Sequence, residues 1–158
     1  MNPGRLSGIF LLLAVLCACS KDISFDEHMA NARQFIETSE YDLAVSELKS
    51  ALLQDPRSGE ARWLLGRIYF ETGDTPSAEK ELKRALELGW SANDVVPLLA
   101  ESLLVLGKYD LLDGLDESGL EAEGKASVLA SRALAASESG ERHRAITLVD
   151  KALEESPE

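Results

Sequence analysis

The chain has 158 residues, of which 28 are acidic and 16 are Lys or Arg, so its formal net charge is −12 at pH 7. A phosphate backbone is bound by an excess of Lys and Arg, and the charge therefore argues against a nucleic-acid partner. Both cysteines, Cys17 and Cys19, lie near the N-terminus. We therefore expect neither a disulfide nor a thiolate metal site in the folded part.

The N-terminal segment has the features of a bacterial export signal. Arg5 gives it a positive end, and the apolar run 9–16 is shorter than the roughly 20 residues of a membrane-spanning helix. The sequence LCACS at 16–20 resembles the lipobox of bacterial lipoproteins. The resemblance implies a signal peptide over residues 1–18 and a lipid on Cys19. An ordinary secretory signal with an incidental cysteine is the alternative.

Lipidation of Cys19 implies a firm membrane anchor, since each buried methylene of an acyl chain adds about 0.8 kcal/mol to membrane binding. Ser20, rather than Asp, follows the cysteine. By the sorting rule of enteric bacteria this implies the outer membrane, with the protein facing the periplasm. We expect residues 19–24 to be a short polar tether to the first helix.

The stretch 59–92 predicts two amphipathic helices joined by a tight turn. The apolar residues of each half recur at three- and four-residue spacing, and the pattern breaks at Gly73. Small residues stand where the two helices must approach closely, at Gly66, Ala78 and Ala85. The pattern resembles the tetratricopeptide repeat, whose period is about 34 residues.

The same pattern recurs along the chain at that period, in register except for one deletion before the last copy. The four predicted units are 25–58, 59–92, 93–125 and 126–158. One hairpin alone does not bury both of its faces, so each copy is expected to pack on its neighbours. The sequence thus predicts an all-α fold, a right-handed tetratricopeptide-repeat solenoid of about four helical hairpins.

Helix start and stop signals place the elements of the first two units. In the first unit we expect helices over 26–38 and 41–54. In the second unit Thr75 is the expected N-cap of the second helix, and Pro76 is expected in the first helical position, where its missing N–H costs nothing.

The third unit shows the least regular repeat pattern of the array. Its first helix is expected to begin at Asp94, so that Pro97 falls in the first turn, where proline is tolerated. The second helix, 109–115, is short and contains Gly114, which lowers helix stability by about 1 kcal/mol relative to Ala. We expect a truncated helix, a bend, and a new helix from 120–121. A degenerate repeat is favoured over a hinge that changes the superhelix pitch.

The last unit ends with a helix expected over 141–155. Its apolar residues Ile146, Val149 and Leu153 have no evident cover. Repeat arrays normally finish with a helix whose outer face is polar. Either the final helix is partly exposed, or the sequence is the N-terminal piece of a longer array, which we favour.

No catalytic constellation is evident in the sequence. His28 and His143 are far apart, and neither has a second His or Cys at metal-ligand spacing. A Gly-rich phosphate loop, a nucleophile elbow and an H-E-x-x-H motif are all missing from the sequence. We therefore expect no enzyme activity, no cofactor and no metal.

In repeats of this kind the first helices line a concave groove, and we predict that this groove binds a protein or an extended peptide. The candidate residues are Arg33, Trp63, Arg67 and Phe70. The two arginines stand one period apart, and arginine beside exposed aromatic rings is typical of interaction hot spots. The alternative is that the aromatic residues fill the packing between repeats and that each arginine pairs with the glutamate four residues on.

The lipobox, the run CSKDISFDEHMANARQFIETSEYDLAVSELKSALLQDP and the following EARWLLGRIYFETGD resemble the start of the PEP-CTERM/exosortase-system tetratricopeptide lipoproteins. These occur in Gram-negative bacteria with exopolysaccharide loci and are usually longer. The resemblance implies a membrane-anchored, periplasm-facing scaffold for protein sorting or exopolysaccharide export, and it supplies no functional residue beyond Cys19. The alternative is an assembly lipoprotein of a pilus, secretin or outer-membrane-protein machine.

Overall fold

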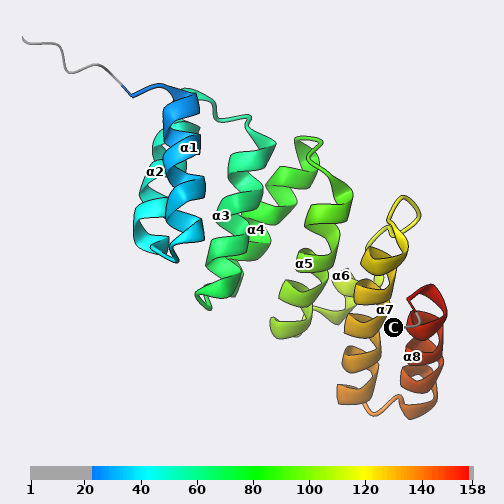
Figure 1. Ribbon diagram of the computed structural model, residues 1–158. Coiled ribbons are helices and arrows are strands. Elements are labelled where there is room, and N and C mark those ends of the chain that lie inside the picture. Colours follow the sequence, from blue (N-terminus) through cyan, green and yellow to red (C-terminus); the bar gives the residue numbers. More distant parts are fainter. Residues whose placement is uncertain (1–22, 157–158) are drawn as a thin grey trace, which may run out of the picture.

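The computed structural model describes residues 23–156, which form eight α-helices and, within that range, no strand. The helices are α1 (Phe25–Glu37), α2 (Tyr41–Gln54), α3 (Gly59–Glu71), α4 (Thr75–Glu87), α5 (Ala92–Val105), α6 (Tyr109–Asp113), α7 (Ala122–Glu138) and α8 (Arg142–Glu155). Consecutive helices pack as hairpins, α1 with α2, α3 with α4 and α7 with α8 (Figure 1). The predicted all-α arrangement is confirmed. The predicted signal peptide 1–18 and Cys19 lie outside the described residues.

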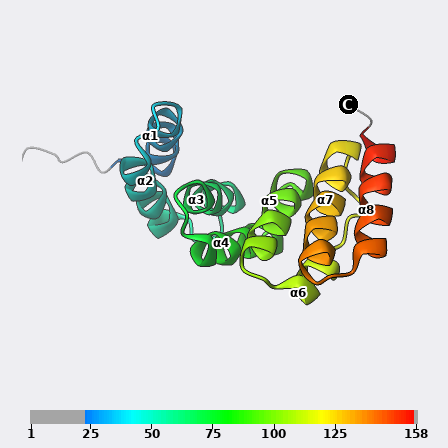
Figure 2. The same ribbon diagram turned by 90° about the horizontal axis from the view of Figure 1, so that it is seen from below.

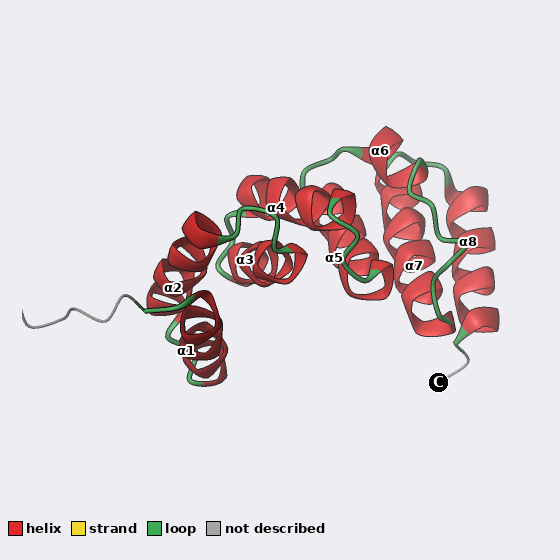
Figure 3. Ribbon diagram, turned by 90° about the horizontal axis from the view of Figure 1, so that it is seen from above, coloured by secondary structure: helices red, strands yellow, loops and turns green. Residues whose placement is uncertain are grey.

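The hairpins stack side by side into an arc (Figure 3). Helices α1, α3, α5 and α7 line its concave side, and α2, α4 and α6 lie on the outer side. Figure 2 shows the same order from the opposite side, with α8 beside α7 at the far end. In such an arrangement each unit is stabilised mainly by its neighbours.

The core is divided into two clusters that meet within the second hairpin. One cluster contains buried residues of α1, α2 and α3, among them Ile68. The other contains buried residues of α4 to α7, among them Leu82. Trp63 and Tyr69 of α3 pack against both clusters. The second hairpin therefore joins the two halves of the array.

The turns inside the hairpins share one residue with positive φ. It is Gly73 (84°) in the second hairpin, Gly107 (65°) in the third and Gly140 (79°) in the fourth, but Ser39 (59°) in the first. For a residue with a Cβ, this left-handed conformation is less favourable by about 1 kcal/mol or more, whereas glycine adopts it readily. The first turn is therefore the strained copy of a repeated feature.

We expect Ser39→Gly to raise the free energy of unfolding by about 0.5–1 kcal/mol, because the relief of strain exceeds the extra entropy that glycine gains in the unfolded chain. Urea denaturation measures the change. The reciprocal variant Gly73→Ser should lose a similar amount. A Ser39→Gly protein that is no more stable than the wild type would contradict the prediction.

The predicted start of α4 is wrong by one residue. The N-cap is Asp74, whose side chain accepts a hydrogen bond from the backbone N–H of Ser77. Thr75 is the first helical residue, so Pro76 follows in the second position instead of the first. The carboxylate of Asp74 is a good N-cap and also suits the positive end of the helix dipole.

The predicted start of α5 at Asp94 is also wrong. The helix begins at Ala92, because the hydroxyl of Ser91 accepts from the backbone N–H of Asp94 and caps it. Pro97 therefore lies inside the helix, beyond its first turn. The bounds of α1, α2 and α8 agree with the predictions within one residue.

The third unit is degenerate, as predicted. Helix α6 has only five residues and stops at Gly114. The next helix, α7, begins at Ala122, within two residues of the expected start at 120–121 and ahead of the unit boundary expected at Ala126. Because α6 is so short, α5 packs directly against α7 as well as against α4.

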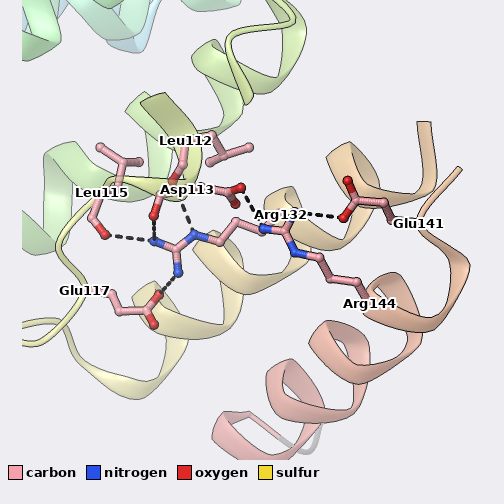
Figure 4. A network of polar contacts seen from close by, with 7 residues as sticks. All are labelled: Leu112, Asp113, Leu115, Glu117, Arg132, Glu141 and Arg144. Carbon is pink, nitrogen blue, oxygen red and sulfur yellow. Dashed lines mark hydrogen bonds and ion pairs between the residues drawn. The ribbon is translucent and has the colours of Figure 1, made fainter. Parts of the chain in front are cut away.

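Arg132 of α7 holds the chain that follows α6 (Figure 4). Its guanidinium donates to the backbone oxygens of Leu112 at 3.2 Å, Leu115 at 2.8 Å and Asp113 at 3.3 Å. It also pairs with the carboxylate of Glu117 at 2.7 Å. These contacts satisfy carbonyls that a longer α6 would have bonded within its own helix.

Two residues of the predicted tether belong to the folded part. Ser24 caps α1 in a reciprocal capping box with Glu27. The backbone oxygen of Ile23 accepts from Nε2 of Gln54 at 2.8 Å. No helix within residues 23–156 is both long enough and apolar enough to cross a membrane.

Candidate functional site

The four predicted groove residues lie on two neighbouring helices of the concave side. Arg33 belongs to α1, and Trp63, Arg67 and Phe70 belong to α3. Both helices face the inside of the arc (Figure 3). Arg33 is exposed, and the other three side chains are half-buried.

Arg33 bridges α1 and α3. Its Nη2 and Nε donate to Oε1 of Glu60, at 2.7 and 3.1 Å. The expected alternative, a pair with Glu37 four residues on, is not the partner observed for Arg33. The reason is tertiary, since the adjacent inner helix brings Glu60 within reach across the boundary between two units.

Arg67 makes looser contacts than Arg33. Its Nε lies 3.6 Å from Oε1 of Glu71, the residue four positions on, as the alternative interpretation predicts. That Nε is buried and has no hydrogen-bond partner. The guanidinium carbon lies 5.2 Å from the centroid of the Trp63 ring, which is a cation–π distance.

Trp63 joins the second unit to the third. Its ring stacks on Trp90, with 6.0 Å between centroids and 26° between planes. Its Nε1 donates to the backbone oxygen of Asp94 at 3.1 Å. Phe70 packs against the cluster built from α4 to α7. Trp63 therefore contributes to packing between units, as the alternative interpretation holds, and Phe70 contributes to the packing of the core.

Trp90 was not anticipated as part of this site. It lies in the connection between α4 and α5. Its Nε1 is buried without a hydrogen-bond partner. The available signal was a tryptophan placed directly after Gly89, where the chain passes from one unit to the next. Its contact with Trp63 depends on how the units stack, which the spacing does not specify.

The charge of the inner helices differs along the arc. Helix α3 carries Arg62 and Arg67 together with Glu60 and Glu71, whereas α5 carries no basic residue. The two carboxylates of α5, Asp94 and Glu101, are both exposed. The inner helices therefore offer a cation beside an aromatic ring on α3 and uncompensated negative charge on the next inner helix.

Comparison with known proteins agrees with this geometry. The family model described as "Tetratricopeptide repeat" matches residues 35–89. Two crystal structures described as MamA are similar to the whole array. One has a TM-score of 0.72 and 21% identity, and covers 84% of this chain and 73% of its own. The other has a TM-score of 0.74 and 21% identity, and covers 87% and 81%.

This chain has the tetratricopeptide-repeat fold. A third similar structure, YrrB, is described as a TPR protein with an unusual peptide-binding site. Its TM-score is 0.58 and its identity 16%, over 87% of this chain and 89% of YrrB. No curated protein matches the sequence.

A buried carboxylate ties the second tetratricopeptide unit to the third. Glu79 of α4 is largely buried and pairs with Lys83 at 2.7 Å and with Lys108, in the α5–α6 turn, at 2.6 Å. Burial raises the pKa of Glu79, but hydrogen bonds from the two lysines and their charges outweigh burial, so its pKa is lowered below the ordinary 4.5.

We expect Glu79→Gln to lower the free energy of unfolding by about 1–2 kcal/mol at pH 7, because both lysines lose their charged partner. A lowered folded-state pKa stabilises the protein above the unfolded-state pKa, and that stabilisation is lost as the pH falls through the folded value. The difference between variant and wild type should therefore shrink below pH 4.5. Urea denaturation at several pH values measures it.

Glu87→Gln is the matched control, since Glu87 pairs with Arg84 on the exposed surface of the same helix. An exposed pair of this kind contributes about 0–1 kcal/mol. Equal losses for the two variants, or a Glu79→Gln loss that is independent of pH, would contradict the assignment. Within residues 23–156, no group of three or more His, Cys, Asp or Glu side chains is placed to hold a metal ion.

Proposed function

We propose that this protein is a membrane-anchored interaction scaffold of the periplasm, which holds an extended segment of a protein partner on its concave side. The observation that carries the proposal is the Arg67–Trp63 pair on an inner helix. A peptide-binding site is also named in the description of the similar YrrB structure. We infer a role in holding a partner, without catalysis.

Arg67 is the better of the two candidate arginines for ligand binding. Arg33 is held by two short hydrogen bonds to Glu60. The carboxylate that pairs with Arg67, that of Glu71, lies 3.6 Å from its Nε, so a ligand carbonyl or carboxylate replaces a weak contact. Trp63, fixed by Trp90, presents a rigid aromatic surface beside the guanidinium.

The neighbouring helix suggests which ligands suit this site. The exposed carboxylates Asp94 and Glu101 of α5 favour a basic residue in the part of the bound peptide that extends from Arg67 toward α5. We therefore propose an extended peptide with a carboxylate or free carbonyls at α3 and a Lys or Arg toward α5.

The proposed anchor is a lipid on Cys19, supported by the lipobox at 16–20. Only three residues separate Cys19 from Ile23, where the described fold begins. Since an extended residue spans at most about 3.6 Å, the array would lie close to the membrane surface. We propose the outer membrane of a Gram-negative cell, facing the periplasm, because Ser20 follows the cysteine.

The resemblance to PEP-CTERM/exosortase-system lipoproteins supports a place in protein sorting or exopolysaccharide export. Crosslinking and pull-down from native membranes tests this assignment with the full-length protein. Recovery of polysaccharide-export proteins is the expected result. Recovery of secretin or barrel-assembly proteins instead would favour the assembly-lipoprotein alternative.

The concave site is tested by comparing Arg67→Ala and Arg33→Ala in the same pull-down. We expect Arg67→Ala to reduce capture about tenfold and Arg33→Ala to have a smaller effect. The double variant Lys80→Ala/Arg84→Ala removes two exposed cations from the outer helix α4 and serves as control. Unchanged capture by Arg67→Ala would dismiss the site.

The anchor is tested separately. Cys19→Ser should move the protein from the membrane to the soluble fraction, and mass spectrometry of the wild type should find an acylated N-terminal cysteine. A wild-type protein without an acyl group in the soluble fraction would refute the anchor, while leaving the concave site standing.

A further inference from the structure

Two exposed apolar side chains lie at the end of the first hairpin where the described fold begins. Leu53, in the last turn of α2, is 85% exposed, and Ile23, just before α1, is 44% exposed. The start of α1 and the end of α2 lie at the same end of the hairpin (Figure 1). A hydrogen bond of 2.8 Å from Nε2 of Gln54 to the backbone oxygen of Ile23 joins them. We call this end, with Ile23 and Leu53, the entry surface.

Other units carry charged residues at the same two positions. In the register of the repeat, Glu87 of α4 and Glu154 of α8 stand where Leu53 stands in α2, and both are exposed. Ile23 directly precedes the N-cap of α1, whereas the exposed Arg57 directly precedes the N-cap of α3. Glutamate and arginine are mostly found in water, and leucine and isoleucine mostly out of it. The first unit is therefore apolar where the other units are solvated, which indicates different surroundings at its end.

The position of Cys19 indicates what these surroundings are, an argument that rests on the lipid anchor of the proposed function. Cys19 stands only four positions before Ile23. Since an extended residue spans at most about 3.6 Å, Ile23 stays within roughly 15 Å of the acylated cysteine. A tether this short keeps the effective concentration of the bilayer at the entry surface high. A surface too small to bind lipid by itself therefore still engages the membrane.

We propose that the entry surface rests on the lipid bilayer, with Leu53 and Ile23 in the interfacial region between headgroups and acyl chains. Burial there removes both apolar side chains from water. The charges beside Leu53 are mixed, since Lys49, Asp55 and Arg57 are all exposed. Apolar contact, and not attraction to anionic lipids, therefore holds this surface to the membrane. The contact turns this end of the first hairpin toward the bilayer, whereas the acyl chains alone leave the array free to rotate.

Quenching of a tryptophan at position 53 tests the proposal. The acylated protein carrying Leu53→Trp is purified from membranes and reconstituted in vesicles of lipids brominated on their acyl chains, which quench tryptophans in the bilayer. The wild-type protein supplies the background of its two tryptophans, Trp63 and Trp90. We expect the brominated lipids to lower the additional emission of the variant about twofold or more, and iodide in the water to have little effect.

Leu43→Trp is the matched control, because Leu43 is a 47% exposed leucine at the opposite end of the same helix. Its emission should be quenched by iodide and not by the brominated lipids. Adding Ile23→Arg to Leu53→Trp should weaken the quenching by lipid about twofold, since a charge replaces one of the two apolar contacts. All three positions are exposed, so circular dichroism should show an intact fold.

The outcomes separate this contact from the anchor. An acylated protein in which iodide, rather than lipid, quenches the tryptophan at position 53 overturns the membrane contact and leaves the anchor standing. Shielding of that position from both quenchers makes a protein, such as a second copy of the chain, the occupant and also overturns the proposal. Mass spectrometry of the same sample reports on the anchor. A protein without an acyl group on Cys19 overturns the anchor together with the contact that depends on it.

Discussion

Replacing Arg132 by Met is expected to lower the free energy of unfolding by about 3 kcal/mol. The Arg132 side chain is only 11% exposed and donates to three backbone oxygens and one carboxylate. Methionine keeps the apolar stem but donates no hydrogen bond. The carbonyls at the end of α6 would be left without the guanidinium, and Glu117 would lose its partner.

Urea denaturation measures the loss, and hydrogen exchange locates it. We expect faster exchange in the chain between α6 and α7, because Arg132 is the side chain that holds this segment to α7 in several places (Figure 4). Arg132→Lys should recover only part of the stability, since an ammonium lacks the planar fork of donors.

Arg144→Met is the control for a neighbouring arginine in the same network. Arg144 of α8 pairs with Asp113 at 2.6 Å and with Glu141 at 3.1 Å, but it is much more exposed than Arg132. Its loss should cost much less stability than the loss of Arg132, because exposed ion pairs contribute little. Similar losses for the two arginine variants would show that Arg132 does not have the special role assigned to it.

Gly66→Ala is expected to lower the free energy of unfolding by about 2 kcal/mol, although alanine is the better helix former. A Cβ at Gly66 would lie 2.7 Å from Cγ and 3.2 Å from the backbone N of Leu82. Overpacking of this kind lowers the free energy of unfolding by about 1–3 kcal/mol or more. The higher helix propensity of alanine raises it by only about 1 kcal/mol. Helix α4 would have to move away from α3, because the backbone of Leu82 does not rearrange locally.

A double-mutant cycle with Leu82→Ala tests this mechanism. Leu82→Ala alone should cost about 2–5 kcal/mol, because Leu82 is fully buried. In the Gly66→Ala background it should cost at least about 1 kcal/mol less, since the new methyl group occupies part of the space. Additive losses would rule out the proposed clash.

Gly124→Ala is the matched control for a helical glycine. A Cβ there would meet Leu120, Pro97 and Asn93 at 3.5 to 3.7 Å, which is ordinary contact. We expect this variant to be as stable as the wild type or up to about 1 kcal/mol more stable, because only the helix-propensity term changes. Destabilisation by Gly124→Ala would mean that the Gly66 result does not report on the α3–α4 crossing.

The sequence by itself determined the repeated architecture of this protein. The period of small residues placed Gly66 at a close helix crossing, and a Cβ there would collide with α4. The broken pattern after Tyr109 predicted the short α6. The uncovered apolar positions of the last unit were also evident, although they left open a partly exposed final helix or a longer array. These features follow from local propensity and from periodicity, both of which act over a few residues. The signal peptide and the lipid on Cys19 stay predictions.

Only the tertiary structure decided which side chains meet across the units. Spacing alone offered Glu37 as the partner of Arg33, but the stacking of α1 on α3 brings Glu60 instead. The contact of Trp63 with Trp90 was likewise not predicted, and neither were the hydrogen bonds from Arg132 to the chain after α6. Such contacts depend on the rotation and displacement of each unit on the next. Those quantities are set by the packing of the whole interface, which no short stretch of sequence specifies.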